Sequence, residues 1–224
     1  MPRNEYQSQL AELRADVVYM SDIVTERLEM GLTALANNDA VLGTEVIEGD
    51  AEINQLYLDL EKQCTDLIAL QQPVAGDLRF IAASFKIITD LERIADLATN
   101  LGEYAKAADN NVFPTVDIQQ LGEVTLEMLA AAMEAYAEDD RDLCYAVDDR
   151  DNELDELAEI ASDTVVRELI ESEQLGPDEE VETFMEDVSR LLLTIRDLER
   201  VGDHTVNIAA RALYMIDNND ELIY

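Results

Sequence analysis

Two stretches of the chain carry nearly the same sequence, and this duplication limits the folds that are open to it. DLERIADLATN spans residues 90–100, DLERVGDHTVN spans residues 197–207, and the two agree at six of eleven positions. A second match sets residues 34–53 against residues 135–154. Two acidic amphipathic helices could resemble each other by composition alone, but both matches occur in the same order. The chain is therefore predicted to contain one structural unit twice.

Each unit has the pattern of α-helices. Glycine and proline are scarce, with eight and four residues, and apolar residues recur at spacings of three and four. Turn-forming stretches divide the chain into helical segments at approximately 8–36, 40–70, 77–107, 115–137, 141–172 and 178–217. Long helices joined by short turns pack antiparallel as bundles. We predict an all-α fold of two tandem three-helix bundles, with six helices in total, in residues 1–110 and 111–224.

The charge of the chain excludes several kinds of partner. The 51 acidic and 15 basic residues give a formal charge of −36, which repels nucleic acids and anionic bilayers. An acidic surface with few lysines is also typical of proteins in a salt-rich cytosol, which favours a halophilic archaeon as the source. Cys64 and Cys144 form no CxxC pattern and are interpreted as free thiols in a reducing compartment. No apolar stretch approaches the length of a membrane span. We expect a soluble cytoplasmic protein without direct membrane insertion.

Acidic residues recur four apart in both units. Residues with this spacing lie one turn apart on the same helix face, and antiparallel neighbours can bring two such faces together. Carboxylates that lie so near each other raise one another's pKa unless a cation lies between them. Oxygen ligands suit Mg²⁺, Ca²⁺, Mn²⁺ or iron better than copper or a structural zinc. The predicted metal ligands are Asp50, Glu92, Asp96, Asp151, Asp155, Glu199 and Asp203.

Other interpretations of these residues remain open. Arg93 and Arg200 stand beside the acids and could form ordinary surface or interbundle salt bridges. The single histidine, His204, corresponds to Leu97 in the first unit, so a polar interface role is favoured over a symmetrical ligand role. One histidine cannot supply two Glu-x-x-His motifs of a di-iron enzyme, and no nucleophile or Gly-rich phosphate loop accompanies it. The chain is predicted not to be an enzyme.

The segments LERIADLATN, LERVGDHTVNIA and QQPVAGDLR (residues 71–79) resemble the PhoU family of phosphate-uptake regulators. The resemblance runs from about residue 10 to residue 217. It implies a tandem three-helix-bundle fold with clusters of iron or zinc on paired E(D)xxxD motifs. It further implies a cytoplasmic, non-catalytic negative regulator of phosphate uptake. The implied partners are the ATP-binding subunit of a phosphate ABC transporter, a phosphate-sensing kinase in many bacteria, and a second copy of the chain in a homodimer.

The family's acidic motifs fall on matching positions of both units. They fall on Glu92 with Asp96 and on Glu199 with Asp203, and the partner motif falls on Asp50 with Asn54 and on Asp151 with Asp155. Asn54 stands where an acid is expected, which weakens the first cluster. Asp77 is interpreted either as a helix N-cap or as a ligand. Two alternative functions are an accessory protein of an ion-coupled phosphate transporter and a metal-free acidic helical scaffold.

Overall fold

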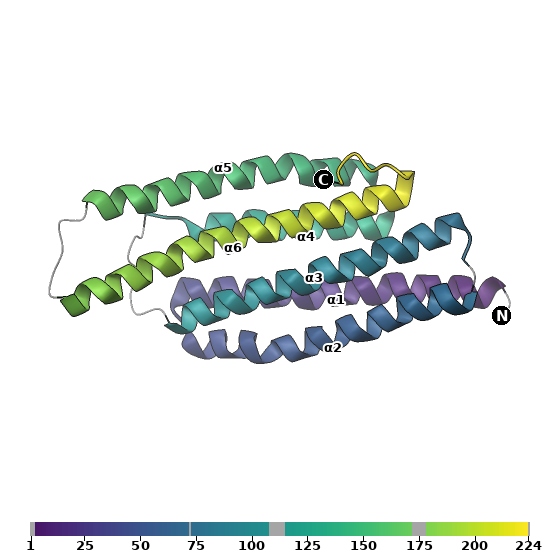
Figure 1. Cartoon of the computed structure of the whole chain (residues 1–224), viewed down its shortest axis with the longest axis horizontal. Coiled ribbons are helices and arrows are strands. Elements are labelled where there is room, and N and C mark those ends of the chain that lie inside the picture. The colour runs from purple at the N-terminus through teal and green to yellow at the C-terminus, as the bar shows by residue number, and fades with distance from the viewer. Residues whose placement is uncertain (1–2, 72, 108–114, 172–177, 224) are drawn as a thin grey trace.

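The computed structural model describes residues 3–71, 73–107, 115–171 and 178–223, and these residues form six long helices. The helices are α1 (Arg3–Asn37), α2 (Ala40–Gln71), α3 (Ala75–Ala107), α4 (Ile118–Glu138), α5 (Arg141–Glu171) and α6 (Asp178–Asp217). Helices α1 to α3 form one antiparallel bundle and α4 to α6 form a second (Figure 1). The prediction of an all-α fold with two tandem three-helix bundles is confirmed.

The ends of the helices follow local capping rules. Helix α4 begins at Ile118, three residues later than expected, because the Asp117 side chain accepts a hydrogen bond from the Gln120 N–H as an N-cap. Residues Asn38 and Asp139, which follow α1 and α4, have left-handed backbones with φ of 49° and 56°. They occupy equivalent positions of the two repeats. The predicted boundary between residues 110 and 111 lies outside the described residues.

Helices α2 and α3 approach closely at a pair of glycines. A Cβ added to Gly43 would lie 2.6 Å from the Gly102 carbonyl oxygen, and one added to Gly102 would lie 2.8 Å from the Gly43 carbonyl oxygen. Only residues without a side chain let two helix backbones come this near. The close contact sets α2 against α3, the two helices that carry the first set of predicted ligands.

Helices α3 and α6 form the main contact between the two bundles, and buried polar groups hold them together. The Asp197 side chain on α6 is only 6% exposed. It accepts hydrogen bonds from the Asn100 amide at 3.0 Å and from the Tyr104 hydroxyl at 2.9 Å, both on α3. Arg200, one turn along α6, lies 3.4 Å from the same carboxylate. A buried carboxylate is stable there because these donors replace its lost water.

The repeat places a matching contact on the other side of this interface. Asp90 on α3 is the counterpart of Asp197, and Asn207 on α6 is the counterpart of Asn100. The Asn207 amide lies 3.5 Å from Asp90 Oδ1, and His204 Nδ1 lies 2.9 Å from the same oxygen. In each repeat, therefore, an Asn side chain contacts an Asp side chain of the other repeat. We call Asp90, Asn100, Asp197 and Asn207 the α3/α6 seam.

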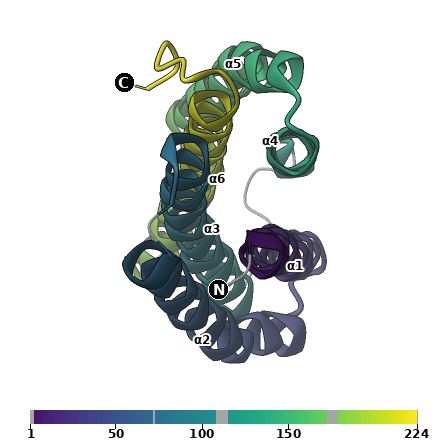
Figure 2. The ribbon, with the colours of Figure 1, turned by 90° about the vertical axis from the view of Figure 1, so that its right-hand side faces the viewer.

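Apolar side chains of both bundles join into one hydrophobic core across the seam. Viewed along the helices, α1 and α4 lie on the same side of the layer formed by α3 and α6 (Figure 2). No helix in the described part of the chain is long and apolar enough to cross a membrane. The acidic residues predicted as ligands lie on α2 and α3 in the first repeat and on α5 and α6 in the second.

The two halves of the seam should differ in strength. We expect Asn100→Ala to lower the free energy of unfolding by about 1.5 kcal/mol, because it removes a hydrogen bond to a buried charged acceptor. Asn207→Ala is the matched control, since its contact is longer and its side chain is exposed, and it should cost less than about 0.5 kcal/mol. Urea denaturation measures both values. Equal losses for the two variants would contradict this account of the seam.

Candidate metal centre

Four predicted ligands of the second repeat lie together between α5 and α6. We call Asp151, Asp155, Glu199 and Asp203 the second acidic cluster. Burial raises the pKa of the Asp151 carboxyl to about 6, and the charges of the other three carboxylates add to the shift. Burial and neighbouring carboxylates, Asp155 first among them, also raise the pKa of Glu199 and of Asp203. The repulsion predicted from the spacing is therefore present in the folded chain.

No positive group is paired with the second acidic cluster. Within the described ranges, none of its four side chains forms a hydrogen bond or an ion pair. Asp151 Oδ1 is buried and has no partner. A buried, unpaired carboxylate oxygen costs free energy, and a bound cation would remove that cost. The donor set and this orphaned oxygen fit a metal ion with a preference for oxygen ligands.

Gly202 lets α5 and α6 approach at this cluster. A Cβ added to Gly202 would lie 3.1 Å from Asp151 Oδ1 and 2.4 Å from Leu154 Cδ2. A larger residue would therefore have to displace both side chains. The counterpart of Gly202 in the first repeat is Ala95, so the two clusters differ in the packing directly beneath them.

The predicted ligands of the first repeat also lie together, but they have partners. We call Asp50, Glu92 and Asp96 the first acidic cluster. Burial, followed by the Asp96 charge, raises the pKa of Asp50 and of Glu92. The Asn54 amide donates a 2.6 Å hydrogen bond to Asp50 Oδ2. Asn54 therefore acts as a donor to the cluster at the position where an acid was expected.

Arg93 and Arg200 occupy equivalent positions of the repeats but pair with different acids. Arg93 lies 3.0 Å from Asp96 and 3.5 Å from Glu92, so it neutralises part of the first acidic cluster. Arg200 instead lies 3.4 Å from Asp197 in the α3/α6 seam. Both arginines thus form salt bridges, Arg93 with the first cluster and Arg200 with Asp197 of the seam between the bundles. Among the described residues, no basic side chain forms an ion pair with the second cluster, although Arg196 lowers the pKa of Glu199 and Arg200 that of Asp203.

His204 and the two seam asparagines serve the interface between the repeats. His204 pairs with Asp90 across the seam, as the interface interpretation predicted, and its proximity lowers the pKa of Glu92 and of Asp203 against the larger upward shifts. Asn100 and Asn207 continue the four-residue spacing of the acids, yet each donates to an Asp of the other repeat. Asp90 and Asp197 were not among the predicted functional residues, although both belong to the duplicated DLER phrase.

Asp77 lies in the first turn of α3, after the helix has begun at Ala75, so it is not the N-cap. It precedes Glu92 by fifteen residues on the same helix, which corresponds to about 22 Å at 1.5 Å per residue. Asp77 therefore cannot share an ion with the first acidic cluster.

The side chains of the two clusters are not arranged as closed ligand shells. In the residues that the structure describes, no three carboxylate, imidazole or thiol groups converge as the ligands of one ion would. The cluster residues are partly exposed, and Asp and Glu side chains can change rotamer without moving the helices.

Comparisons with known proteins place both repeats in one family. Residues 17–105 and 118–212 match the family model described as PhoU domain. The phosphate-specific transport system accessory protein PhoU homolog of Pseudomonas putida is 32% identical over 225 residues, covering 96% of this chain and 82% of that protein. The homolog of Caulobacter vibrioides is 33% identical over 207 residues, with 91% and 86% covered.

Solved structures agree with these relatives. The crystal structure of PhoU from Pseudomonas aeruginosa has a TM-score of 0.87 and 28% identity, and the match covers 96% of this chain and 100% of that one. The likeness extends over both bundles, so the duplicated unit of the sequence corresponds to the duplicated domain of the family.

The unpaired Asp151 predicts an unusual pH dependence for the metal-free protein. Its pKa rises from 3.8 to about 6 on folding, so the folded state binds this proton more tightly than the unfolded state. The stability that this tighter proton binding adds is fully present below the unfolded-state pKa of 3.8. It is lost as the pH rises through about 6. We expect the free energy of unfolding, measured in chelator by urea denaturation, to increase from pH 7 to pH 5. Asp151→Asn should flatten this increase, whereas Asp163→Asn, an exposed change on the same helix, should leave it intact. An unchanged slope in Asp151→Asn would contradict the assignment.

Proposed function

The chain belongs to the PhoU domain family, and from this premise we propose that it is a metal-binding regulator of phosphate uptake. The relatives are named as accessory proteins of the phosphate-specific transport system, which supports a role beside a transporter. One histidine cannot supply the two Glu-x-x-His motifs of a di-iron enzyme, and the sequence has no Gly-rich phosphate loop, which supports a regulatory role over catalysis. The observation that carries the metal proposal is the buried Asp151 oxygen. It has no hydrogen-bond partner and lies near the carboxylates of Asp155, Asp203 and Glu199.

The second acidic cluster is proposed as the stronger of two metal sites. Asp151, Asp155, Glu199 and Asp203 would hold the ion, and the first cluster would bind more weakly because Arg93 and Asn54 already occupy its carboxylates. A cation there supplies positive charge and open coordination positions, which oxygen atoms of phosphate can fill. Asp155, Glu199 and Asp203 are exposed, so an ion held by them would be accessible from solvent.

We propose a cytoplasmic location and a transporter partner. The proposed partners are the ATP-binding subunit of a phosphate ABC transporter and, in cells that have one, a phosphate-sensing kinase. A homodimer is the proposed assembly. An accessory role beside an ion-coupled phosphate transporter is distinguished by which transporter's activity changes when the gene is removed.

Metal content tests the proposed sites directly. Protein purified without added metal should contain bound iron, zinc or another divalent ion by elemental analysis. Glu199→Gln combined with Asp203→Asn should remove most of it, because these changes delete two of four carboxylates in the cluster that lacks a paired cation. Glu92→Gln combined with Asp96→Asn is the matched control and should remove less. A parent protein without metal, or no loss in the first variant, would favour a metal-free scaffold.

The regulatory role is tested in cells. Deletion of the gene should raise phosphate accumulation in phosphate-replete medium, since a negative regulator of uptake is lost. Uptake of labelled phosphate and intracellular phosphate, measured in replete and starved cells, report the effect. The wild-type gene should restore it, and the Glu199→Gln, Asp203→Asn variant should restore less. Unchanged uptake in both media would reject the proposal, whatever the metal content.

A further inference from the structure

A groove lies between α1 and α4, the two helices that do not carry the acidic clusters. Its volume is about 400 Å³. The apolar floor includes Val18 on α1 and the buried Leu129 and Met133 on α4. The hydroxyl of Ser21, which also lines it, already donates to the Val18 carbonyl oxygen. The groove thus offers apolar surface and few unused polar groups.

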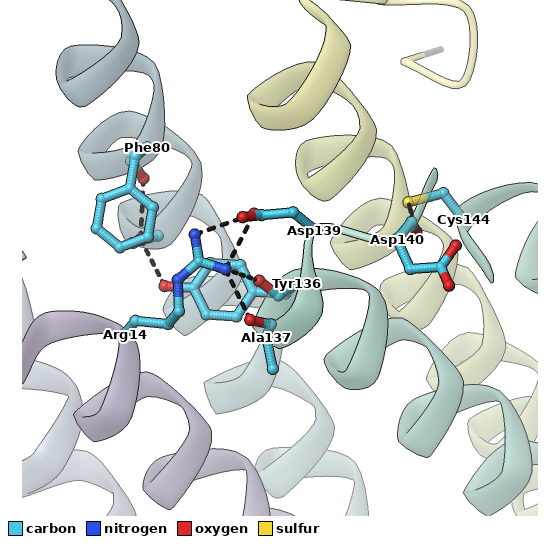
Figure 3. Close-up of polar contacts among 8 residues, drawn as sticks. Arg14, Phe80, Tyr136, Ala137, Asp139, Asp140 and Cys144 are labelled. Carbon is cyan, nitrogen blue, oxygen red and sulfur yellow. Dashed lines mark hydrogen bonds and ion pairs between the residues drawn. The ribbon is translucent and has the colours of Figure 1, made fainter. Parts of the chain in front are cut away.

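Contacts between the two bundles close the groove at each end. At one end, Arg14 on α1 donates to the carbonyl oxygens of Tyr136 and Ala137 and to the Asp139 carboxylate at the end of α4 (Figure 3). Its guanidinium also lies over the Phe80 ring, 5.0 Å from the centroid.

At the other end, α1 and α4 touch near Leu32. Gln119 donates to the Leu32 carbonyl oxygen, and a Cβ added to Gly122 would lie 2.5 Å from the Leu32 side chain. The groove is therefore a feature with fixed ends, because contacts between the two repeats join α1 and α4 at both.

The rim of the groove is acidic. Asp22, Glu26 and Glu29 follow one another at spacings of four and three on α1, so they stand along one edge. Glu134 stands on the α4 side. All four side chains are exposed, and no Lys or Arg is among the residues that line the groove. An occupant must therefore combine apolar groups that face the floor with positive groups that face the rim.

We infer that this groove binds an amphipathic helix of a partner protein, with aliphatic side chains along one face and Lys or Arg beside them. A helix laid in a groove presents anchors at i, i+3, i+4 and i+7, which matches an elongated apolar floor between two parallel edges. Met133 adds an adaptable surface for such anchors. The groove binds this helix whether or not the acidic clusters hold metal, since it uses different helices.

The negative charge of the chain favours a basic helix over the other possible occupants of the groove. A second copy of the chain would bring like charge to the rim, because the chain has 51 acidic and 15 basic residues. Nucleic acids and anionic bilayers are repelled for the same reason. A small polar ligand would lack convergent hydrogen-bonding groups on the floor.

A designed peptide tests the groove. The probe is a fluorescent Leu/Lys peptide of about 18 residues, or five helical turns, with leucines at helical spacing. A scrambled peptide of the same composition controls for general attraction to an acidic protein. Binding is measured by fluorescence anisotropy with full-length protein at about 0.15 M salt, where the screening length is about 8 Å.

Two changes at the groove are compared with two elsewhere. Ala130→Trp fills the groove from an exposed position and should weaken binding at least about tenfold, equivalent to about 1.4 kcal/mol. Glu26→Gln combined with Glu134→Gln removes two rim charges and should weaken it about fivefold. The controls are Ala69→Trp on α2 and the pair Glu156→Gln, Glu159→Gln on α5, which are exposed sites outside the groove and should leave affinity within about twofold.

The outcomes separate the alternatives. Losses confined to the two groove variants, with the scrambled peptide bound more weakly by the parent, support the inference. Equal binding of both peptides, or equal losses in the control variants, would overturn it, because attraction to the acidic surface would then explain the binding. A dimer that Ala130→Trp converts to a monomer, seen by sedimentation, would also overturn it by showing that a second copy covers the groove. Circular dichroism checks that each variant remains helical.

Discussion

The reciprocal contact between Asp and Asn across α3 and α6 is the constraint on which the rest of the structure depends. Each repeat carries an Asp ten residues before an Asn on its last helix. Because α3 and α6 run antiparallel, the Asn of each repeat reaches the Asp of the other. A buried carboxylate without donors would be costly, so these pairs favour one register of the two helices over slipped ones. Helices α1 and α4 are also joined across the bundles, at Arg14 and near Leu32.

The duplicated sequence has produced two acidic clusters with different electrostatics. In the first acidic cluster, Arg93 forms ion pairs with Glu92 and Asp96, and the Asn54 amide donates a hydrogen bond to Asp50. In the second acidic cluster, the equivalent Arg200 pairs with Asp197 of the seam, so no basic side chain of the described residues forms an ion pair with the four carboxylates. Repulsion of this kind persists in a folded protein when packing elsewhere stabilises it, and the core shared by both bundles provides that packing. The physical difference between the two clusters therefore arises from the partner of one arginine, from Asn54 in place of an acid, and from Ala95 in place of Gly202.

The sequence was sufficient to predict six helices, their pairing into repeats and the meeting of the acidic faces. Spacing gives the direction in which a residue points around its helix. The helix that faces Glu199 and Asp203 is α5, which carries Asp155. Spacing could not show which neighbour a residue meets when a helix has several. Asn207 has the same spacing from Asp203 as Asp203 has from Glu199, yet it belongs to the seam. Helix ends were misplaced by a few residues because a cap such as Asp117 is also compatible with a helix interior.

The groove and the acidic clusters depend on the seam in different ways. Each cluster lies within one repeat, so its carboxylates stay together even if the bundles shift relative to each other. The groove is formed by one helix from each repeat, so its shape depends on how the two bundles are placed along the contact of α3 with α6. A partner that rests on α1 and α4 together therefore binds only while the seam holds that register. Arg14 reinforces the same arrangement from the side of the groove, because it ties α1 to the end of α4. The polar residues between the repeats thus set the geometry of the surface that is formed by both.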